Sequence, residues 1–200
     1  MTTQESICIL KKHISSSDLL ISSLGRTAEE VFQQIENVDR VLFLDCLGAV
    51  TGVAVGISLG CPHNRVFALD TDGSFMYDMT IFHTVAALSD KLKSLVIIIF
   101  DNGILESGGG LKSRMIPFCW EKYAESWGLS LEVVNDLARL NDILNRTHSD
   151  YPLIIVLKVD NTGIEQTCRK DLDGIESKYR FKRFIHNNIN GNIIRPCLKN

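Results

Sequence analysis

Three short segments, each placed at or just beyond the end of an apolar run, carry the residue types best suited to chemistry. They are Asp45-Cys46-Leu47-Gly48, Asp72-Gly73-Ser74 and Asp101-Asn102-Gly103. The second offers a carboxylate, a glycine that permits close backbone approach and a hydroxyl, and the third offers an amide oxygen in a turn. Mg²⁺ prefers hard oxygen ligands completed by phosphate oxygens and water. A carboxylate and an amide on neighbouring strand ends could therefore supply a metal site together.

The elements that must position these segments alternate between short apolar runs and longer amphipathic ones. Strands are predicted over 19–22, 41–44, 65–69, 95–100, 131–133 and 153–159, and helices over 7–13, 27–37, 78–92, 118–127, 136–147 and 174–185, with a glycine-rich helix ending near residue 60. This alternation predicts an α/β fold: a doubly wound, mostly parallel sheet with helices on both faces. Such sheets bind ligands at the carboxyl ends of their strands, where the three segments fall.

Several local features refine this prediction. Thr27 and Glu30 have the spacing of a capping box, and residues 102–110 form a glycine-rich loop. Glycines four residues apart, from Gly48 to Gly60, would let another helix approach closely, and we favour a subunit interface there. Residues 1–160 are predicted to form one domain, followed over 161–200 by a connector, a helix and an irregular tail.

Composition excludes several classes of function. The formal net charge of −3 argues against general attraction to nucleic acid, although residues 161–200 are basic. None of the six cysteines forms a Cys-x-x-Cys pair, which argues against a zinc ribbon. No signal peptide is visible, and no apolar stretch reaches the roughly 20 residues that span a bilayer. We therefore expect a protein of the reducing cytoplasm with no membrane partner.

The spacing of the second and third segments is more informative than either alone, since Asp-Gly and Asn-Gly are common turn dipeptides. Together, Asp72-Gly73-Ser74 and Asp101-Asn102-Gly103 resemble the thiamine diphosphate motif, which has Gly-Asp-Gly and then, some two dozen residues later, Asn-Asn or Asp-Asn. Residues 44–48 resemble the loop that lies under the cofactor's aminopyrimidine in this family. Within it, the likeness is to sulfopyruvate and phosphonopyruvate decarboxylases, and it covers about residues 5–160.

The resemblance implies a role for each matching residue. Asp72 and Asn102 would bind Mg²⁺ through their side chains, and Ile104 through its backbone carbonyl. Leu47 would support the bent cofactor from below. The other expected cofactor contacts lie in the same loops: Asp45, Cys46 and Gly48 at the aminopyrimidine, and Gly73, Ser74, Ser107 and Gly108 at the diphosphate.

The resemblance also implies a reaction. The chain would be a subunit of a thiamine diphosphate- and Mg²⁺-dependent 2-oxo acid decarboxylase, a lyase, similar to the separate β subunit of the sulfopyruvate enzymes. Phosphonopyruvate or another small 2-oxo acid is the alternative substrate. A separate pyrimidine-domain (α) chain would supply the glutamate that activates the cofactor, so we expect an oligomer. A non-catalytic subunit of the same fold is the alternative of another class. A generic nucleotide-binding domain is disfavoured, because Walker and Gly-x-Gly-x-x-Gly motifs are missing.

Three departures from the family pattern bear on these expectations. Thr71 replaces the motif's first glycine, which is tolerable if its φ is negative. Glu106 replaces a usual glycine and is either an acid near the cofactor or a solvent-facing loop carboxylate. Relatives tend to read Ser-Thr-Gly-Gly-Gln in the next stretch, where this chain reads Ser107-Gly108-Gly109-Gly110-Leu111. Lys112 and Arg114, which follow this stretch, would either attract an anionic substrate or be solvated.

Overall fold

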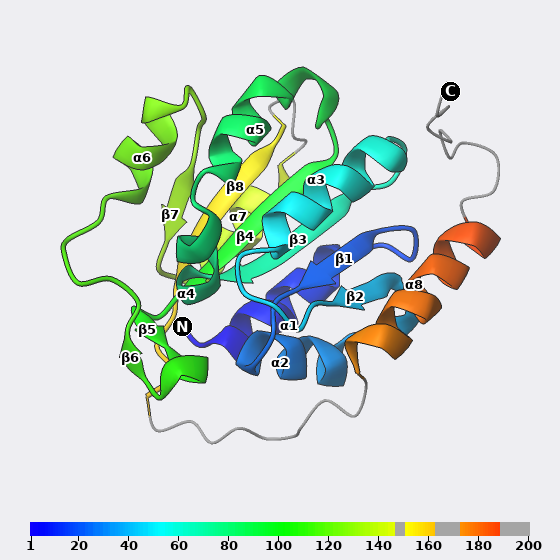
Figure 1. The fold of residues 1–200 in the computed structure, drawn as a ribbon, viewed down its shortest axis with the longest axis horizontal. Coiled ribbons are helices and arrows are strands. Elements are labelled where there is room, and N and C mark those ends of the chain that lie inside the picture. The colour runs from blue at the N-terminus through cyan, green and yellow to red at the C-terminus, as the bar shows by residue number, and fades with distance from the viewer. Residues whose placement is uncertain (147–150, 163–172, 189–200) are drawn as a thin grey trace.

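A computed structural model describes residues 1–146, 151–162 and 173–188. Its main feature is a six-stranded parallel sheet in the order β2-β1-β3-β4-β8-β7 (Figure 1). The strands are β1 (Leu19–Ser22), β2 (Val41–Phe43), β3 (Val66–Thr71), β4 (Leu95–Asp101), β7 (Glu132–Val134) and β8 (Leu153–Lys158). This arrangement confirms the predicted doubly wound α/β fold.

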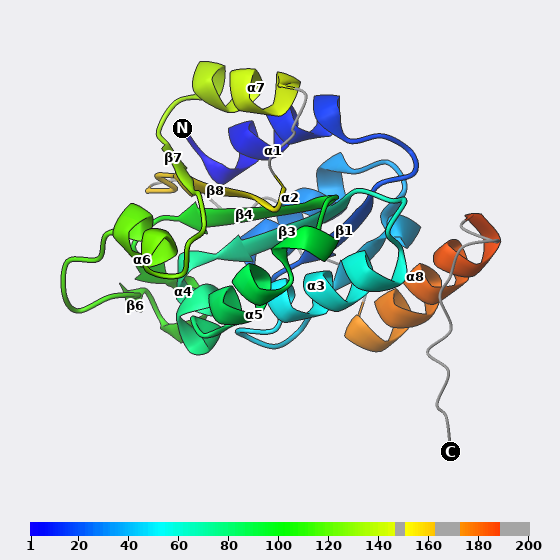
Figure 2. The same cartoon turned by 90° about the horizontal axis from the view of Figure 1, so that it is seen from above.

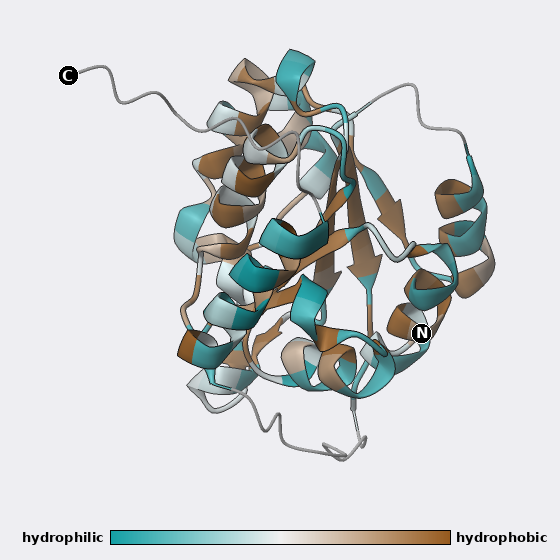
Figure 3. Cartoon of the chain, turned by 90° about the vertical axis from the view of Figure 1, so that its right-hand side faces the viewer, coloured by the Kyte–Doolittle hydropathy of each residue, from teal (hydrophilic) through white to brown (hydrophobic). Residues whose placement is uncertain are grey.

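Helices cover both faces of the sheet, as the view from above shows (Figure 2). One face packs against α1 (Thr3–His13), α2 (Arg26–Gln34) and α7 (Leu137–Asn145). The other packs against α3 (Val50–Gly60), α4 (Asp72–Phe75), α5 (Ile81–Ala87), α6 (Trp120–Ser126) and α8 (Gly174–Asn188). Because side chains alternate along a strand, Ile98 contributes to the first core and Ile97 and Ile99 to the second. All seven residues of β4 are buried, and the strands form the hydrophobic centre of Figure 3.

The strand order places a topological switch point between β1 and β3. The chain leaves β1 through α2 on one face, whereas it leaves β3 through α4 and α5 on the other. The two connections diverge and leave a crevice above the carboxyl ends of these strands, which is where open α/β sheets bind ligands.

Helix α8 protects the exposed edge of the sheet at β2. The Ser177 hydroxyl accepts a hydrogen bond from Phe43 N at 2.9 Å and donates one to the Val41 carbonyl at 3.2 Å. These bonds satisfy backbone groups that an edge strand would otherwise present to other chains. A Cβ atom at Gly174 would lie 2.5 Å from the Asp45 carboxylate, so the start of α8 packs tightly on the loop after β2.

Several predicted element boundaries were wrong. Helix α1 begins at Thr3 rather than residue 7, because Thr2 and Glu5 form a capping box there. The capping box predicted at Thr27 and Glu30 is absent: α2 begins at Arg26 after Gly25, and both residues are buried inside it. The predicted helix 78–92 is interrupted, with 3-10 turns on either side of α5.

The predicted loop 102–110 also contains regular structure. It forms a small antiparallel hairpin, β5 (Ile104–Leu105) and β6 (Leu111–Lys112), joined by a 3-10 turn at Glu106–Gly108. The end of the predicted helix 136–147, most of the connector 161–173 and most of the irregular segment 187–192 lie outside the described residues. Within the described ranges, no helix combines the length and apolarity needed to cross a bilayer.

Candidate functional site

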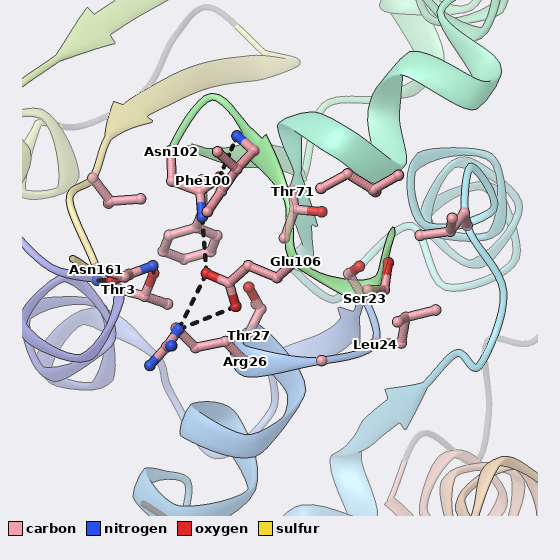
Figure 4. Close-up of a pocket in the computed structure, with 16 residues that line it drawn as sticks. Thr3, Ser23, Leu24, Arg26, Thr27, Thr71, Phe100, Asn102, Glu106 and Asn161 are labelled. Atoms are coloured by element: carbon pink, nitrogen blue, oxygen red, sulfur yellow. Dashed lines mark hydrogen bonds and ion pairs between the residues drawn. The ribbon is translucent and has the colours of Figure 1, made fainter. Parts of the chain in front are cut away.

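A pocket lies at the switch point and is walled by the ends of five strands (Figure 4). Its residues come from the loop after β1, from Leu47 after β2, and from the segments that follow β3, β4 and β8. They include Ser23, Leu24, Gly25, Arg26, Thr27, Leu47, Thr71, Asn102, Ile104, Leu105, Glu106, Ser107 and Asn161. Five predicted site residues therefore meet at one pocket, although they come from separate loops: Leu47, Asn102, Ile104, Ser107 and the catalytic candidate Glu106.

The turn after β3 is built by Thr71, the residue that departs from the family motif. Its φ of −113° is negative, as the sequence argument required, and its hydroxyl accepts a hydrogen bond from Ser74 N at 3.2 Å. Thr71 thus acts as the N-cap of the short helix α4. The Ser74 hydroxyl in turn accepts a hydrogen bond from Gly48 N at 3.0 Å, which ties the predicted aminopyrimidine loop to the predicted diphosphate turn.

Two glycines hold the hairpin loop close to this turn. A Cβ atom at Gly73 would lie 2.8 Å from Leu105 Cδ1 and 3.6 Å from the Ile104 carbonyl oxygen. A Cβ atom at Gly108 would lie 2.8 Å from Leu105 Cδ2. Leu105 is therefore packed between the two glycines, and this contact brings the Ile104 carbonyl to the Asp72–Gly73 turn.

A buried ion cluster lies beside the same turn. Arg114 bonds Asp72 Oδ2 at 2.9 Å and Asp101 Oδ1 at 2.7 Å, and Ser113 donates to the same oxygen of Asp72. Burial raises the pKa of Asp72 to about 6; the Ser113 hydrogen bond opposes this rise, the Asp101 charge adds to it, and the Arg114 charge opposes it.

The neighbouring carboxyl group, Asp101, behaves in the opposite way. Burial alone would raise its pKa, but hydrogen bonds from Lys158, Arg114 and Trp120 outweigh burial and hold the pKa below its usual value. The Trp120 indole nitrogen donates to Asp101 Oδ2 at 2.7 Å, and Lys158 Nζ lies 2.5 Å from the same oxygen. Asp101 is thus held in its charged form, whereas Asp72 is not fully compensated.

Glu106 lies between Asn102 and Arg26 at the mouth of the pocket. Asn102 Nδ2 donates to Glu106 Oε1 at 2.9 Å, and Arg26 Nε lies 3.3 Å from both carboxylate oxygens (Figure 4). The Glu106 side chain is 33% exposed. Glu106 is therefore an exposed residue of the hairpin turn, as the interpretation as a solvent-facing loop carboxylate expected, and it is also ion-paired with Arg26.

The oxygen atoms at the turn suit a hard divalent cation. Asp72 Oδ1 is buried and has no hydrogen-bond partner among the described residues. Asn102 Oδ1 accepts a local bond from Ile104 N, at 3.1 Å. Together with the Ile104 carbonyl these atoms match the donor set that Mg²⁺ takes when phosphate and water complete its shell. In the part of the chain that the structure describes, no cluster of three or more His, Cys, Asp or Glu side chains offers another metal site.

Some predicted residues lie away from the pocket. Asp45 and Cys46 are exposed on the loop after β2, and Asp72, Gly73 and Ser74 are buried behind the pocket wall. Lys112 is exposed as one interpretation expected, but Arg114 is neither solvated nor free for a substrate, because it is paired with two carboxylates.

Sequence reasoning missed the contribution of β1. Ser23 is fully buried, its hydroxyl has no partner among the described residues, and it lines the pocket together with Arg26. The rule that ligands bind at strand ends would have included Ser23, since it directly follows β1. No sequence pattern pointed to Leu105, because its role depends on its packing between Gly73 and Gly108.

The fold and this site define an α/β cofactor-binding domain with its pocket at the switch point of a parallel sheet. Residues 28–157 match the family described as thiamine pyrophosphate enzyme, C-terminal TPP binding domain. The chain belongs to this family. Thiamine pyrophosphate is thiamine diphosphate, so the cofactor expected from the motif is supported. No individually curated protein matches the chain significantly.

Proposed function

We propose that the chain is the diphosphate-binding subunit of a thiamine diphosphate- and Mg²⁺-dependent 2-oxo acid decarboxylase. The observation that carries this proposal is the buried Asp72 Oδ1 at the carboxyl edge of the sheet, which has no hydrogen-bond partner in the described part of the chain. A buried carboxylate oxygen without a donor costs free energy unless a bound group satisfies it. A divalent cation bound to a diphosphate would do so.

Each residue of the turn and the hairpin has a role in this proposal. Asp72, Asn102 and the Ile104 carbonyl hold the metal ion. Gly73 and Ser74 leave room for the diphosphate and bind it, and Ser107 and Gly108 close over it. Leu47 and the loop from Asp45 through Cys46 to Gly48 support the aminopyrimidine.

Charge and cofactor chemistry complete the assignment. Arg26, at the start of α2 on the pocket wall, adds positive charge for the diphosphate. When bound, thiamine diphosphate supplies a nucleophilic carbon and an electron sink for loss of CO₂.

Exposed apolar side chains support a protein partner over this edge. Leu111, Met115 and Ile116, on and after the hairpin, are 67%, 88% and 76% exposed, and Tyr77 behind the Asp72 turn is 64% exposed. Apolar groups gathered near a binding site mark an interaction surface more often than a free one. We propose that a pyrimidine-domain chain covers them and supplies the activating glutamate.

The substrate we favour is sulfopyruvate, with phosphonopyruvate or another small 2-oxo acid as the alternative. The test is to reconstitute the chain with a pyrimidine-domain partner and to measure CO₂ released from each acid. Release that requires both chains and Mg²⁺, and that disappears in Asp72→Ala, would support the proposal. CO₂ release by the isolated, pure chain would refute the shared active site.

Arg114 motivates a second candidate, a non-catalytic subunit of the same fold. Its guanidinium lies on the carboxylate that would bind the metal, which is the arrangement expected if the metal had been lost. This candidate predicts that the chain gains no thermal stability from Mg²⁺ with thiamine diphosphate, and that Asp72→Ala leaves the activity of the complex unchanged.

A further inference from the structure

Arg114 joins two carboxylates that are otherwise deeply buried. The side chains of Asp72 and Asp101 are 0% and 1% exposed, and the guanidinium reaches one with each terminal nitrogen, at 2.9 and 2.7 Å. The guanidinium also lies 5.7 Å from the centre of the Trp120 ring, and its side chain is only 17% exposed. These contacts fix the arginine inside the site rather than at its surface.

The two carboxylates depend on Arg114 to different degrees. Asp101 has further donors in Lys158 and Trp120, both on Oδ2. Asp72 has Ser113 and Arg114 on Oδ2, and among the described side chains Arg114 is the one cation in contact with it. Since a buried carboxylate is strongly destabilising without a cation, Arg114 is what makes a charged Asp72 tolerable when no metal is bound.

Arg114 and a metal ion would approach opposite oxygens of the same carboxylate. The guanidinium uses Oδ2, whereas Oδ1 has no partner among the residues that the structure describes. Two cations on one carboxylate repel each other at short range, in a site too buried for water to screen them well. Whatever favours Arg114 at Asp72 must therefore weaken metal binding there.

We propose that Arg114 is a resident cation: it neutralises Asp72 in the metal-free chain and competes electrostatically with Mg²⁺ for that carboxylate. The inference rests on the proposed function, because it takes Asp72 as the metal ligand. It gives Arg114 two opposite effects, stabilising the metal-free fold and lowering the affinity for the metal. A merely structural arginine would have the first effect without the second.

The test compares three variants of the full chain by thermal-shift titration with MgCl₂ at fixed thiamine diphosphate. Arg114→Gln should lower the Tm of the metal-free chain by roughly 5 °C, because Asp72 loses its cation. The same variant should reach its half-maximal shift at about tenfold less Mg²⁺ than the wild-type chain. Arg114→Lys keeps the charge but cannot reach both carboxylates, so its Tm and its Mg²⁺ requirement should lie between those of the wild-type chain and Arg114→Gln. If Arg114→Gln does not fold, Arg114→Lys provides the test.

Lys158→Met is the matched control. Lys158 pairs with Asp101 but not with Asp72, so this variant should lower the Tm without tightening Mg²⁺ by more than about twofold. The inference would be overturned if Arg114→Gln reached its half-maximal shift at the same Mg²⁺ concentration as the wild-type chain, or at a higher one. That result would leave the proposed function intact. No Mg²⁺ response in either chain would instead overturn both.

Discussion

Two buried Asp–Arg pairs lie at opposite ends of the parallel strands, one at the amino edge and one at the carboxyl edge of the sheet. At the amino edge, just before β1, Arg65 Nη2 lies 2.6 Å from Asp18 Oδ2, and the guanidinium lies 4.9 Å from the centre of the Phe67 ring. At the carboxyl edge, Arg114 makes the corresponding contacts with Asp72 and Trp120. Both pairs thus combine a buried carboxylate with an arginine on an aromatic ring.

What differs is how completely each pair is satisfied. Asp18 also accepts a hydrogen bond from Ser15 N at 2.8 Å, and Arg65 donates to the His13 carbonyl. Asp72, by contrast, has one oxygen without a partner within the described ranges, and it shares its arginine with a second carboxylate, Asp101. An Asp–Arg pair whose polar atoms all have partners stabilises the fold. A pair with an unsatisfied carboxylate oxygen, at the end of the sheet where ligands bind, indicates a binding site.

The largest difference between the pairs should appear in stability. Asp18→Ala leaves Arg65 without its carboxylate and should lower the free energy of unfolding by about 3 kcal/mol. Asp72→Ala leaves Arg114 paired with Asp101 and removes a like charge, so its effect should stay within about 1 kcal/mol. Urea denaturation of both variants at pH 7 measures this, and an Asp72→Ala chain as unstable as Asp18→Ala would contradict the comparison.

A pH dependence of the stability is expected from the carboxyl edge. Burial raises the pKa of Asp70 to about 7 from 3.8, despite hydrogen bonds from Ser74 and Thr71. The folded chain therefore holds more protons than the unfolded chain between these values, and the free energy of unfolding falls as the pH rises from about 4 to 7.

Replacing Asp70 should remove the part of this dependence that Asp70 contributes. Asp70→Asn should be more stable than the wild-type chain by on the order of 2 kcal/mol above pH 7 and equal to it near pH 4. Denaturation curves at both pH values give the two differences. An advantage that is the same at pH 4 and pH 8 would show that Asp70 is not the titrating group.

The glycine contacts offer a smaller, local perturbation of the site. Gly73→Ala should push Leu105 and the Ile104 carbonyl away and weaken Mg²⁺ binding by about tenfold, a cost near 1.4 kcal/mol. Adding Leu105→Ala should restore part of that loss, since it removes the clashing methyl group. Gly56→Ala, which meets no atom within 4 Å, is the control and should bind normally. Equal Mg²⁺ titrations for all variants would argue against a site at Ile104.

The smallest effect should come from the ion pair at the mouth of the pocket. Glu106→Gln removes a half-exposed partner of Arg26 and should change stability by less than about 1 kcal/mol. It should tighten thiamine diphosphate about threefold, because a negative charge near the diphosphate is lost, and the gain should shrink in 1 M NaCl. Calorimetric titration at two salt concentrations measures this affinity. An affinity for thiamine diphosphate that stays constant or falls in Glu106→Gln would contradict the prediction.

Much of the fold followed from apolar periodicity, since all six strands were predicted and β4 was recognised as buried on both faces. The helix starts were less predictable, because Gly25 rather than Thr27 precedes α2 and a capping box of Thr2 and Glu5 starts α1 ahead of its apolar residues. The motif spacing located Asp72 and Asn102 at adjacent strand ends. It could not reveal that Arg114 reaches Asp72, or that Glu106 pairs with Arg26, because these long side chains meet only through the path of the hairpin.

The central claim, that Asp72 belongs to a site for Mg²⁺ and thiamine diphosphate, is tested most directly by one thermal-shift titration. The wild-type chain is titrated with the cofactor, with and without MgCl₂, beside Asp72→Ala. We predict a rise in Tm that requires both ligands and that is absent in the variant. A wild-type Tm that does not move, or an equal rise in Asp72→Ala, would contradict the claim.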